Sequence, residues 1–247
     1  MTTGFEDKHI IVTGAASGIG RATALRFAQR GGRVIAVDRD ADRLASLAGE
    51  ADGSIRTAHG DITDPPFAAQ VVADAGGRID VLANVAGVMD SFLPSGEVDD
   101  ATWDRVIAIN LTAPQRFMKA VLPGMVAAGA GAIVNVASEA GLRGGCAGAA
   151  YTASKHGLIG LTKNTAFLYA RTGVRANVVA PGPVDTGMRP DFQSALAAER
   201  IPPFLGATIS AVGQPGDLAA AIVWLAGAET GFINGAVLAV DGGWSAI

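Results

Sequence analysis

The chain has 247 residues, of which 49% are apolar, and its formal net charge is −4. This apolar fraction is sufficient for a large buried core, and the length lies within the range that α/β folds accommodate in one domain. The Lys and Arg residues are dispersed, which argues against a nucleic-acid-binding surface. No apolar run approaches the ~20 residues of a membrane helix, and the charged N-terminus is not a signal peptide. We therefore expect a cytoplasmic protein with no membrane partner.

Short apolar segments alternate with helical patterns along the chain. The expected strands are residues 9–13, 33–38, 55–60, 79–84, 132–137, 174–180 and 236–240. This alternation is typical of an α/β fold with a doubly wound parallel sheet flanked by helices. No linker, repeat or low-complexity tract interrupts it, so the sequence predicts a single domain over residues 1–247, with about seven strands.

The first strand runs directly into a glycine-rich turn, Gly14-Ala15-Ala16-Ser17-Gly18-Ile19-Gly20. Helical periodicity follows over residues 21–30, so the turn joins a strand to a helix N-terminus. Glycine lets the backbone approach a ligand closely, and a helix N-terminus favours negative charge, which together suit a pyrophosphate. The spacing is not G-x-G-x-x-G, and a purely structural turn is the alternative.

The second strand ends in Asp38, roughly 20 residues beyond the glycine turn, where ribose recognition requires an acid. A carboxylate there accepts hydrogen bonds from the adenosine hydroxyls and repels a 2'-phosphate. Arg39 can in principle stack on adenine or meet a phosphate, but no basic residue stands inside the glycine turn. We therefore expect NAD, with NADP the less favoured cofactor.

Tyr151 and Lys155 lie one helical turn apart, on the same face of an expected helix. A free tyrosine titrates near ~10, and a cation within about 4–6 Å lowers its pKa, so the pair can make a general acid/base. An exposed helix face is the alternative. Ser138 follows the strand at residues 132–137, and strand ends are where open parallel sheets bind ligands.

Together these motifs resemble those of the classical short-chain dehydrogenase/reductase family over essentially the whole chain, which implies a Rossmann fold. The matching elements are the TGxxxGxG turn at residues 13–20, the NNAG element at residues 84–87 with Val85 in place of the second Asn, the helix asparagine Asn110, the catalytic serine Ser138, the YxxxK pair Tyr151 and Lys155, and the PG-x-V-x-T segment at residues 181–186.

The resemblance implies an oxidoreductase and a role for each catalytic residue. Tyr151 exchanges the hydroxyl proton while hydride passes between the substrate carbon and nicotinamide. Lys155 lowers the pKa of Tyr151 and holds the nicotinamide ribose. Ser138 hydrogen-bonds the substrate oxygen, and Asn110 supports a water that links Lys155 to solvent.

The expected cofactor-binding residues come from the motifs and the resemblance together. They are Gly14, Ser17, Gly18, Ile19, Gly20, Asp38, Arg39, Asp61, Ile62, Asn84, Ala86, Gly87, Tyr151, Lys155, Pro181, Gly182, Val184 and Thr186. Asp61 and Ile62 would reach the adenine, although Asp61 can equally cap a helix. The Val184 backbone and Thr186 would fix the carboxamide. We expect no metal site, because the His residues are scattered.

The substrate is less defined by the sequence. Small residues dominate residues 139–148, which predicts a roomy pocket wall, and residues 187–210 are expected to form a mobile lid with apolar contacts such as Met188. An apolar secondary alcohol or ketone fits this region. Arg143 or Arg189 could instead meet an acidic substrate, with a solvated surface position as the alternative.

Two other functions remain open. One is a 3-oxoacyl thioester reductase, which many chains similar to this one resemble. Asp38 argues against the NADPH that such a reductase usually uses. A catalytically silent nucleotide-binding scaffold or redox sensor is disfavoured by the intact catalytic residues.

The family resemblance also implies a homotetramer that pairs long helices near residues 99–125 and 151–170. Apolar side chains on these helices are candidates for that interface: Phe117, Met118, Val121, Leu122, Leu161, Phe167 and Leu168. The alternative is that they complete the core of the monomer.

Overall fold

The structure is a computed structural model that describes residues 4–187 and 191–246. A single sheet of seven parallel strands has the order β3-β2-β1-β4-β5-β6-β7, which confirms the predicted doubly wound α/β fold. The strands are β1 (His9–Thr13), β2 (Arg33–Asp38), β3 (Ile55–His59), β4 (Val81–Asn84), β5 (Gly131–Val136), β6 (Val174–Pro181) and β7 (Val237–Val240).

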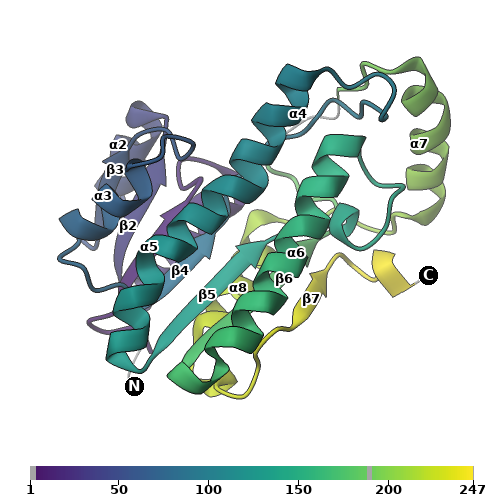
Figure 1. The fold of residues 1–247 in the computed structure, drawn as a ribbon. Helices are drawn as coiled ribbons and strands as arrows, with labels where there is room; N and C mark the ends of the chain where they lie inside the picture. Colours follow the sequence, from purple (N-terminus) through teal and green to yellow (C-terminus); the bar gives the residue numbers. More distant parts are fainter. Residues whose placement is uncertain (1–3, 188–190, 247) are drawn as a thin grey trace.

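Helices cover both faces of the sheet, with α5 and α6 crossing one face and α8 lying behind the strands (Figure 1). The helices are α1 (Gly18–Gln29), α2 (Ala41–Gly49), α3 (Phe67–Asp74), α4 (Asp100–Ile107), α5 (Ala113–Ala128), α6 (Ala149–Tyr169), α7 (Ala195–Thr208) and α8 (Pro215–Ala226). Within the described ranges, none of these helices is both long and apolar enough to cross a membrane.

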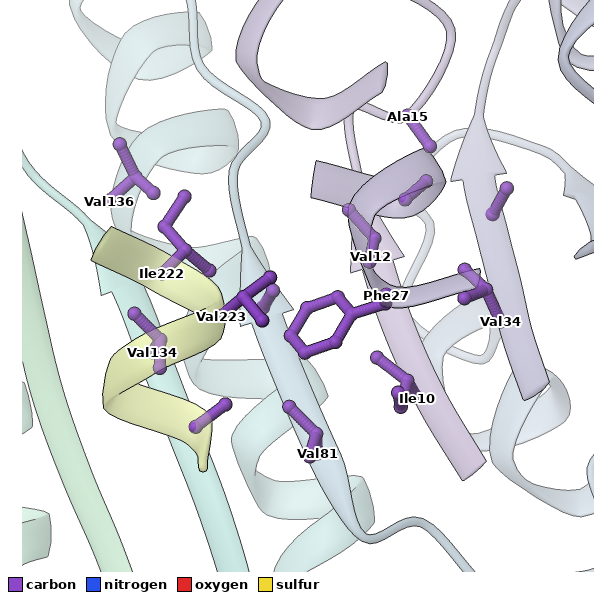
Figure 2. Close-up of a cluster of buried hydrophobic side chains, with 14 of the residues drawn as sticks. Ile10, Val12, Ala15, Phe27, Val34, Val81, Val134, Val136, Ile222 and Val223 are labelled. Atoms are coloured by element: carbon purple, nitrogen blue, oxygen red, sulfur yellow. The ribbon is translucent and has the colours of Figure 1, made fainter. Parts of the chain in front are cut away.

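The two faces of the sheet carry separate apolar cores, because successive side chains of a strand point to opposite faces. In β1, Ile10 and Val12 pack with α1, α2 and α8, whereas Ile11 packs with α3 and α5. Figure 2 shows the first core, in which the fully buried Phe27 of α1 lies among strand residues and near Val223 of α8. Burial of this surface holds the helices against the sheet.

The long helix expected near residues 99–125 is two helices joined by a π-helical turn at Ala108–Thr112. Such turns are rare and are frequently found at functional sites. Asn110 lies in this turn and is fully buried. Periodicity in the sequence did not reveal the extra residue in this turn.

Four of the residues assigned to a helix interface belong to the core instead. Phe117, Met118, Val121 and Leu122 are all buried, so their assignment to an exposed face was wrong. Helix α5 packs against α3 as well as the sheet, and the rings of Phe67 and Phe117 meet edge to face at 6.5 Å. Two packing partners hide a wider apolar stripe than the sheet alone.

On α6, Leu161 is partly buried against the same core, whereas Phe167 and Leu168 are 82% and 61% exposed. Of the seven side chains assigned to the interface, Phe167 and Leu168 are the two that are exposed. The homotetramer therefore stays a prediction, and the apolar surface that supports it is smaller than expected.

Candidate active site

The strand order reverses between β1 and β4, and this switch point is where open α/β sheets bind ligands. Thr13, the last residue of β1, joins the two strand ends, because its hydroxyl accepts hydrogen bonds from the backbone N–H groups of Val85 (3.0 Å) and Ala86 (3.2 Å). The glycine turn therefore lies against the loop after β4. A Cβ on Gly14 would lie 2.8 Å from the Cα of Ala86.

The glycines of the turn are required by its geometry. Gly14 and Gly18 have φ angles of 69° and 50°, in the left-handed region that favours glycine. A Cβ on Gly20 would lie 2.0 Å from the carbonyl oxygen of Gly14. Ser17 is the N-cap of α1 but makes no capping hydrogen bond with its side chain. This helix start has no side-chain cap and fits an anionic group such as a pyrophosphate.

Asp38 lies at the end of β2, and its carboxylate is hydrogen-bonded to nearby backbone. One oxygen accepts from the N–H of Ala16 at 3.0 Å, and the other accepts from the N–H groups of Arg39 and Asp40 at 2.7 and 3.2 Å. The acid that was predicted to bind ribose therefore also braces the glycine turn. Arg39 itself is exposed.

Asp61 and Ile62 follow β3, at the position expected for adenine contacts. The Asp61 carboxylate accepts hydrogen bonds from the backbone N–H and the hydroxyl of Thr63, both at 2.8 Å, and these bonds lower its pKa. Ile62 is partly buried against the core. Asp61 thus closes the turn ahead of α3, and an adenine contact remains a prediction.

Tyr151 and Lys155 lie in the first two turns of α6, with Ser138 opposite them at the end of β5. The Tyr151 hydroxyl forms a hydrogen bond with Ser138. The Lys155 Nζ lies 5.4 Å from the centre of the Tyr151 ring and donates to the carbonyl of Val136 at 2.9 Å. The three predicted catalytic side chains therefore meet at one edge of the sheet.

The pKa values of this pair run against one prediction. Burial raises the pKa of Tyr151 to about 12, partly offset by the Ser138 hydrogen bond, and burial lowers the pKa of Lys155 to about 8. The expectation that Lys155 lowers the pKa of Tyr151 is wrong for this chain, because burial dominates and Lys155, with its own lowered pKa, has lost its charge in the pH range where Tyr151 titrates.

Asn110 links the loop after β4 to α6. Its side chain accepts from the N–H of Val88 and donates to the carbonyl of Val88, both at 2.9 Å, and it also donates to the hydroxyl of Ser154 at 3.2 Å. A Cβ on Gly87 would lie 3.3 Å from the Lys155 Nζ and 3.4 Å from the Asn110 Oδ1. Glycine at this position therefore leaves a space that both polar groups face.

Asn84, at the end of β4, is buried beneath this space. Its amide donates to Asn135, which in turn donates to Thr162, each at 2.8 Å. The Oδ1 of Asn84 is buried and accepts no hydrogen bond within the described residues. Asn84 was expected to bind the cofactor, and that contact stays a prediction because its side chain is enclosed by protein.

The segment at residues 181–186 returns to the glycine turn. Val184 pairs with Gly213, and the N–H of Thr186 donates to the carbonyl of Val184 at 2.9 Å. A Cβ on Gly18 would lie 3.1 Å from the Cβ of Thr186. Pro181 and Gly182 end β6 at the same edge. The glycine turn therefore lies against residues 84–87 through Gly14 and against residues 181–186 through Gly18, and the chemistry of these segments fits a nicotinamide dinucleotide.

Arg143 was expected to meet an acidic substrate or solvent, and the structure corrects both readings. Its guanidinium donates to the fully buried Glu139 at 2.8 and 3.1 Å and to the carbonyl of Trp244 at 2.8 Å, and it lies over the Trp244 ring. The pairing fixes the segment after Ser138 to the C-terminal end of the chain, because the buried acid requires a partner. Met188 and Arg189 lie outside the described residues.

A cleft of about 710 Å³ lies next to the catalytic residues, between α4, α7 and the start of α6. It is bordered by Phe92, Pro94, Ser95, Trp103, Gly144, Ala147, Gly148, Ala149, Thr152, Ala153, His156, Leu196, Ala197, Arg200 and Ile201. The small-residue segment and the expected lid both contribute to it. Tyr151 and Ser138 do not line it, whereas Thr152, the next residue after Tyr151, does.

Two residues that shape the site were missed by the sequence analysis: Asp90 and Glu139. Glu139 stands four residues before Arg143, a spacing typical of paired charges on one helix face. Asp90 interrupts an apolar stretch just after a strand end, which is itself a signal of a buried partner. In the described part of the chain, no three His, Cys, Asp or Glu side chains gather as a metal site would require.

Comparison with known proteins defines the class. The family model for short chain dehydrogenases matches residues 8–197, so the chain belongs to the short-chain dehydrogenase/reductase family and is an oxidoreductase. It is 45% identical to the short-chain dehydrogenase/reductase olcF of Penicillium canescens over 98% of both chains.

Two further relatives have more specific names. The chain is 39% identical to a cis-4-hydroxycyclohexanecarboxylate dehydrogenase of Sinomonas cyclohexanicum over the full length of both chains. The crystal structure of levodione reductase superposes with a TM-score of 0.88 and 31% identity, over 98% of this chain and 99% of the other.

Proposed function

We propose that this protein transfers hydride between NAD(H) and a secondary alcohol or its ketone, with Tyr151 as the general acid/base. The observation that carries the proposal is the hydrogen bond between the Tyr151 and Ser138 hydroxyls beside Lys155, at the carboxyl edge of the sheet. Bound nicotinamide supplies the hydride acceptor or donor.

Each side chain has one task in this scheme. In alcohol oxidation, Tyr151 takes the hydroxyl proton as the C–H pair leaves the carbon as hydride, and the C–O bond becomes a carbonyl. In ketone reduction, Tyr151 returns that proton to the oxygen. Ser138 donates a hydrogen bond to the same oxygen and stabilises its developing charge. Lys155 retains N–H groups beyond the one given to Val136, and these can hold ribose hydroxyls.

NAD is the favoured cofactor because of Asp38. The carboxylate at the end of β2 is oriented by three backbone N–H groups and adds a negative charge where a 2'-phosphate would lie. Arg39 is the neighbouring cation but is exposed. The repulsion therefore outweighs any single surface contact from that arginine.

The substrate class follows from the cleft. Its wall is mostly apolar, and Arg200 borders it, which suits a cyclic or branched secondary alcohol with or without an acidic group. One relative is named for a hydroxycyclohexanecarboxylate. Replacing Arg200 by Gln should then raise KM for an acidic alcohol and leave KM for its neutral analogue unchanged.

The test of the function is a panel of cyclic alcohols and ketones, followed by nicotinamide absorbance with both cofactors. Tyr151→Phe should lower turnover by at least ~10²-fold while the Kd for NADH is retained. Tyr169→Phe is the matched control, since Tyr169 is the other tyrosine of the chain and ends the same helix. Near-normal turnover by Tyr151→Phe would contradict the assignment.

Two alternatives are decided by the same panel. Turnover of a 3-oxoacyl thioester with NADPH, in preference to every alcohol with NAD, would identify the thioester reductase. Tight NAD binding without turnover of any substrate would indicate a silent scaffold or redox sensor.

We also propose a cytoplasmic homotetramer. Phe167 and Leu168 leave an apolar patch on α6, and pairing across two-fold axes would cover it. Sedimentation at micromolar concentration tests this, because a single species at the 24.9 kDa chain mass excludes a tetramer.

A further inference from the structure

Asp90 is a fully buried carboxylate that has no part in the chemistry proposed above. It lies in the loop between β4 and α4. Its Oδ1 accepts from the backbone N–H groups of Phe92 and Gly148, both at 3.2 Å, and its Oδ2 accepts from the N–H of Tyr151 at 2.8 Å. Within residues 4–187 and 191–246, no Lys or Arg forms an ion pair with it. Among these described residues, its charge is therefore stabilised by backbone N–H groups.

Asp90 supplies the cap that α6 lacks. The N-cap residue, Gly148, has no side chain to accept from the first turn, and Tyr151 is the third residue of the helix. An Asp or Ser at the N-cap accepts from that third N–H in many helices. Here an aspartate 61 residues earlier in the chain does so. The cap thus joins the loop after β4 to the helix that carries Tyr151 and Lys155.

Gly148 is the second residue on which this cap depends. Its φ of −76° is accessible to any residue, so its backbone conformation does not require glycine. A Cβ there would instead lie 2.5 Å from the Asp90 Oδ2. Space for the carboxylate is the reason for glycine at this position, and a local capping side chain is replaced by a tertiary one.

The loop after Asp90 is bent to hold the carboxylate in place. Ser91 and Phe92 have φ angles of 53° and 59°, in the left-handed region that is unfavourable for residues with a Cβ. The Phe92 ring stacks on Phe192 at 4.1 Å, and the carbonyl of Leu93 accepts from the N–H of Ala149 at 2.8 Å. These contacts offset the backbone strain at Ser91 and Phe92 and hold the loop against the start of α6.

The negative charge of Asp90 acts on the Tyr151 phenol, in addition to the hydrogen bond that its carboxylate accepts from the Tyr151 backbone N–H. A helix N-terminus carries partial positive charge, which favours phenolate. Three groups face Tyr151: Lys155 over the ring, Ser138 at the hydroxyl and Asp90 at the helix start. Asp90 opposes the helix dipole and raises the pKa of Tyr151 beyond the effect of burial.

We propose that Asp90 is a positioning residue for proton transfer: its carboxylate clamps the first turn of α6, which carries Tyr151, to the loop after β4. The proposal rests on the proposed role of Tyr151 as general acid/base. It adds a residue outside the four that the family motifs identify.

The first experiment requires no turnover, so its outcome is independent of the proposed function. In a Tyr169→Phe background, Tyr151 is the single tyrosine of the chain, and the near-ultraviolet absorbance of phenolate reports its titration. Asp90→Asn should move the midpoint to lower pH by about half a unit or more. The matched control is Asp99→Asn, which removes a carboxylate cap from the start of α4 and should leave the midpoint in place.

The second experiment uses the active protein. The ascending limb of kcat/KM against pH in alcohol oxidation should shift to lower pH in Asp90→Asn and not in Asp99→Asn. A loss of stability with an unchanged midpoint in both experiments would mean that Asp90 is only structural, and the proposal would be overturned.

A third variant covers the case in which Asp90→Asn does not fold. Gly148→Ala keeps the charge but displaces the carboxylate, so kcat should fall by about tenfold or more while the Kd for NADH changes by less than about threefold. An unchanged kcat would contradict the proposed clamping role of Asp90.

Discussion

Two helix N-termini point into the site, and they satisfy their N–H groups in opposite ways. At α1, Ser17 provides no side-chain cap and the glycine turn has no Cβ at Gly14, Gly18 or Gly20. At α6, the first turn is closed by the buried carboxylate of Asp90. An uncapped N-terminus can hold a phosphate, whereas a closed one fixes the side chains that follow it. The same local structure thus serves ligand binding in one place and positioning in the other.

The first prediction concerns the open N-terminus, where we expect the largest effect on cofactor binding. Gly20→Ala would place a Cβ 2.0 Å from the Gly14 carbonyl oxygen, so the turn must change shape. We expect the affinity for NADH to fall by at least ~100-fold, which corresponds to about 2.7 kcal/mol. Gly49→Ala is the control, because a Cβ there meets nothing within 4 Å and the residue ends a helix. Fluorescence titration of NADH measures both, and equal affinities would show that the open turn does not bind the cofactor.

The second prediction concerns the buried pair beside Ser138. Burial raises the pKa of Glu139, and Arg143 opposes that rise. Arg143→Met leaves Glu139 buried without its partner and should lower the free energy of unfolding by about 3–5 kcal/mol near neutral pH. Because a carboxyl group with a raised pKa destabilises the folded state as pH rises, the loss should shrink toward low pH, where Glu139 takes up a proton.

A double variant separates the charge from the packing in that pair. Arg143→Met with Glu139→Gln should recover most of the stability lost by Arg143→Met alone, since no buried charge remains. Urea denaturation measures all three proteins. If the double variant is as unstable as the single one, the pair contributes through packing against Trp244 and not through charge.

The sequence predicted the open N-terminus better than the closed one, for a physical reason. Gly14, Gly18, Gly20 and Asp38 lie within about 25 residues of one another, in one strand-turn-helix-strand segment, so a short sequence motif describes them. The seven strands were found within a few residues for the same reason, because each is a local apolar run.

The closed N-terminus depends on contacts that only the fold creates. Asp90 meets Tyr151 across 61 residues, and Arg143 reaches Trp244 across 101. The pKa of Tyr151 was also predicted in the wrong direction, since the sequence indicates which charges are near but not how deeply they are buried. Similarly, the core positions of Phe117 and Val121 required the packing of α3 on α5.

The third prediction concerns Lys155 and uses stability as its readout. The pKa of Lys155 is lowered from 10.5 to about 8 by burial, so between these values the folded chain has lost a proton that the unfolded chain keeps. Lys155 should therefore make the free energy of unfolding rise from pH 8 toward pH 10, by up to about 1.4 kcal/mol per pH unit. Tyr151, with its raised pKa, opposes this only above pH 10.

Lys155→Met should flatten that rise, whereas the exposed Lys163→Met on the same helix should preserve it. Urea denaturation across this pH range gives the slopes. Equal slopes in the two variants would show that Lys155 keeps its ordinary pKa in the folded protein.

The smallest expected effect concerns Asp38, the one carboxylate beside the open N-terminus. Asp38→Ser removes the charge that repels a 2'-phosphate and the brace on the N–H of Ala16. The ratio of kcat/KM with NAD to that with NADP should fall by about tenfold, which corresponds to about 1.4 kcal/mol. Asp40→Ser is the matched control: it removes a charge two residues away, and serine still caps α2. Its ratio should stay within about twofold of the parent. A parent protein that already prefers NADPH would contradict the assignment of Asp38. An equal fall of the NAD-to-NADP ratio in both variants would indicate that the overall negative charge of this region, and not a specific contact of Asp38, sets the preference.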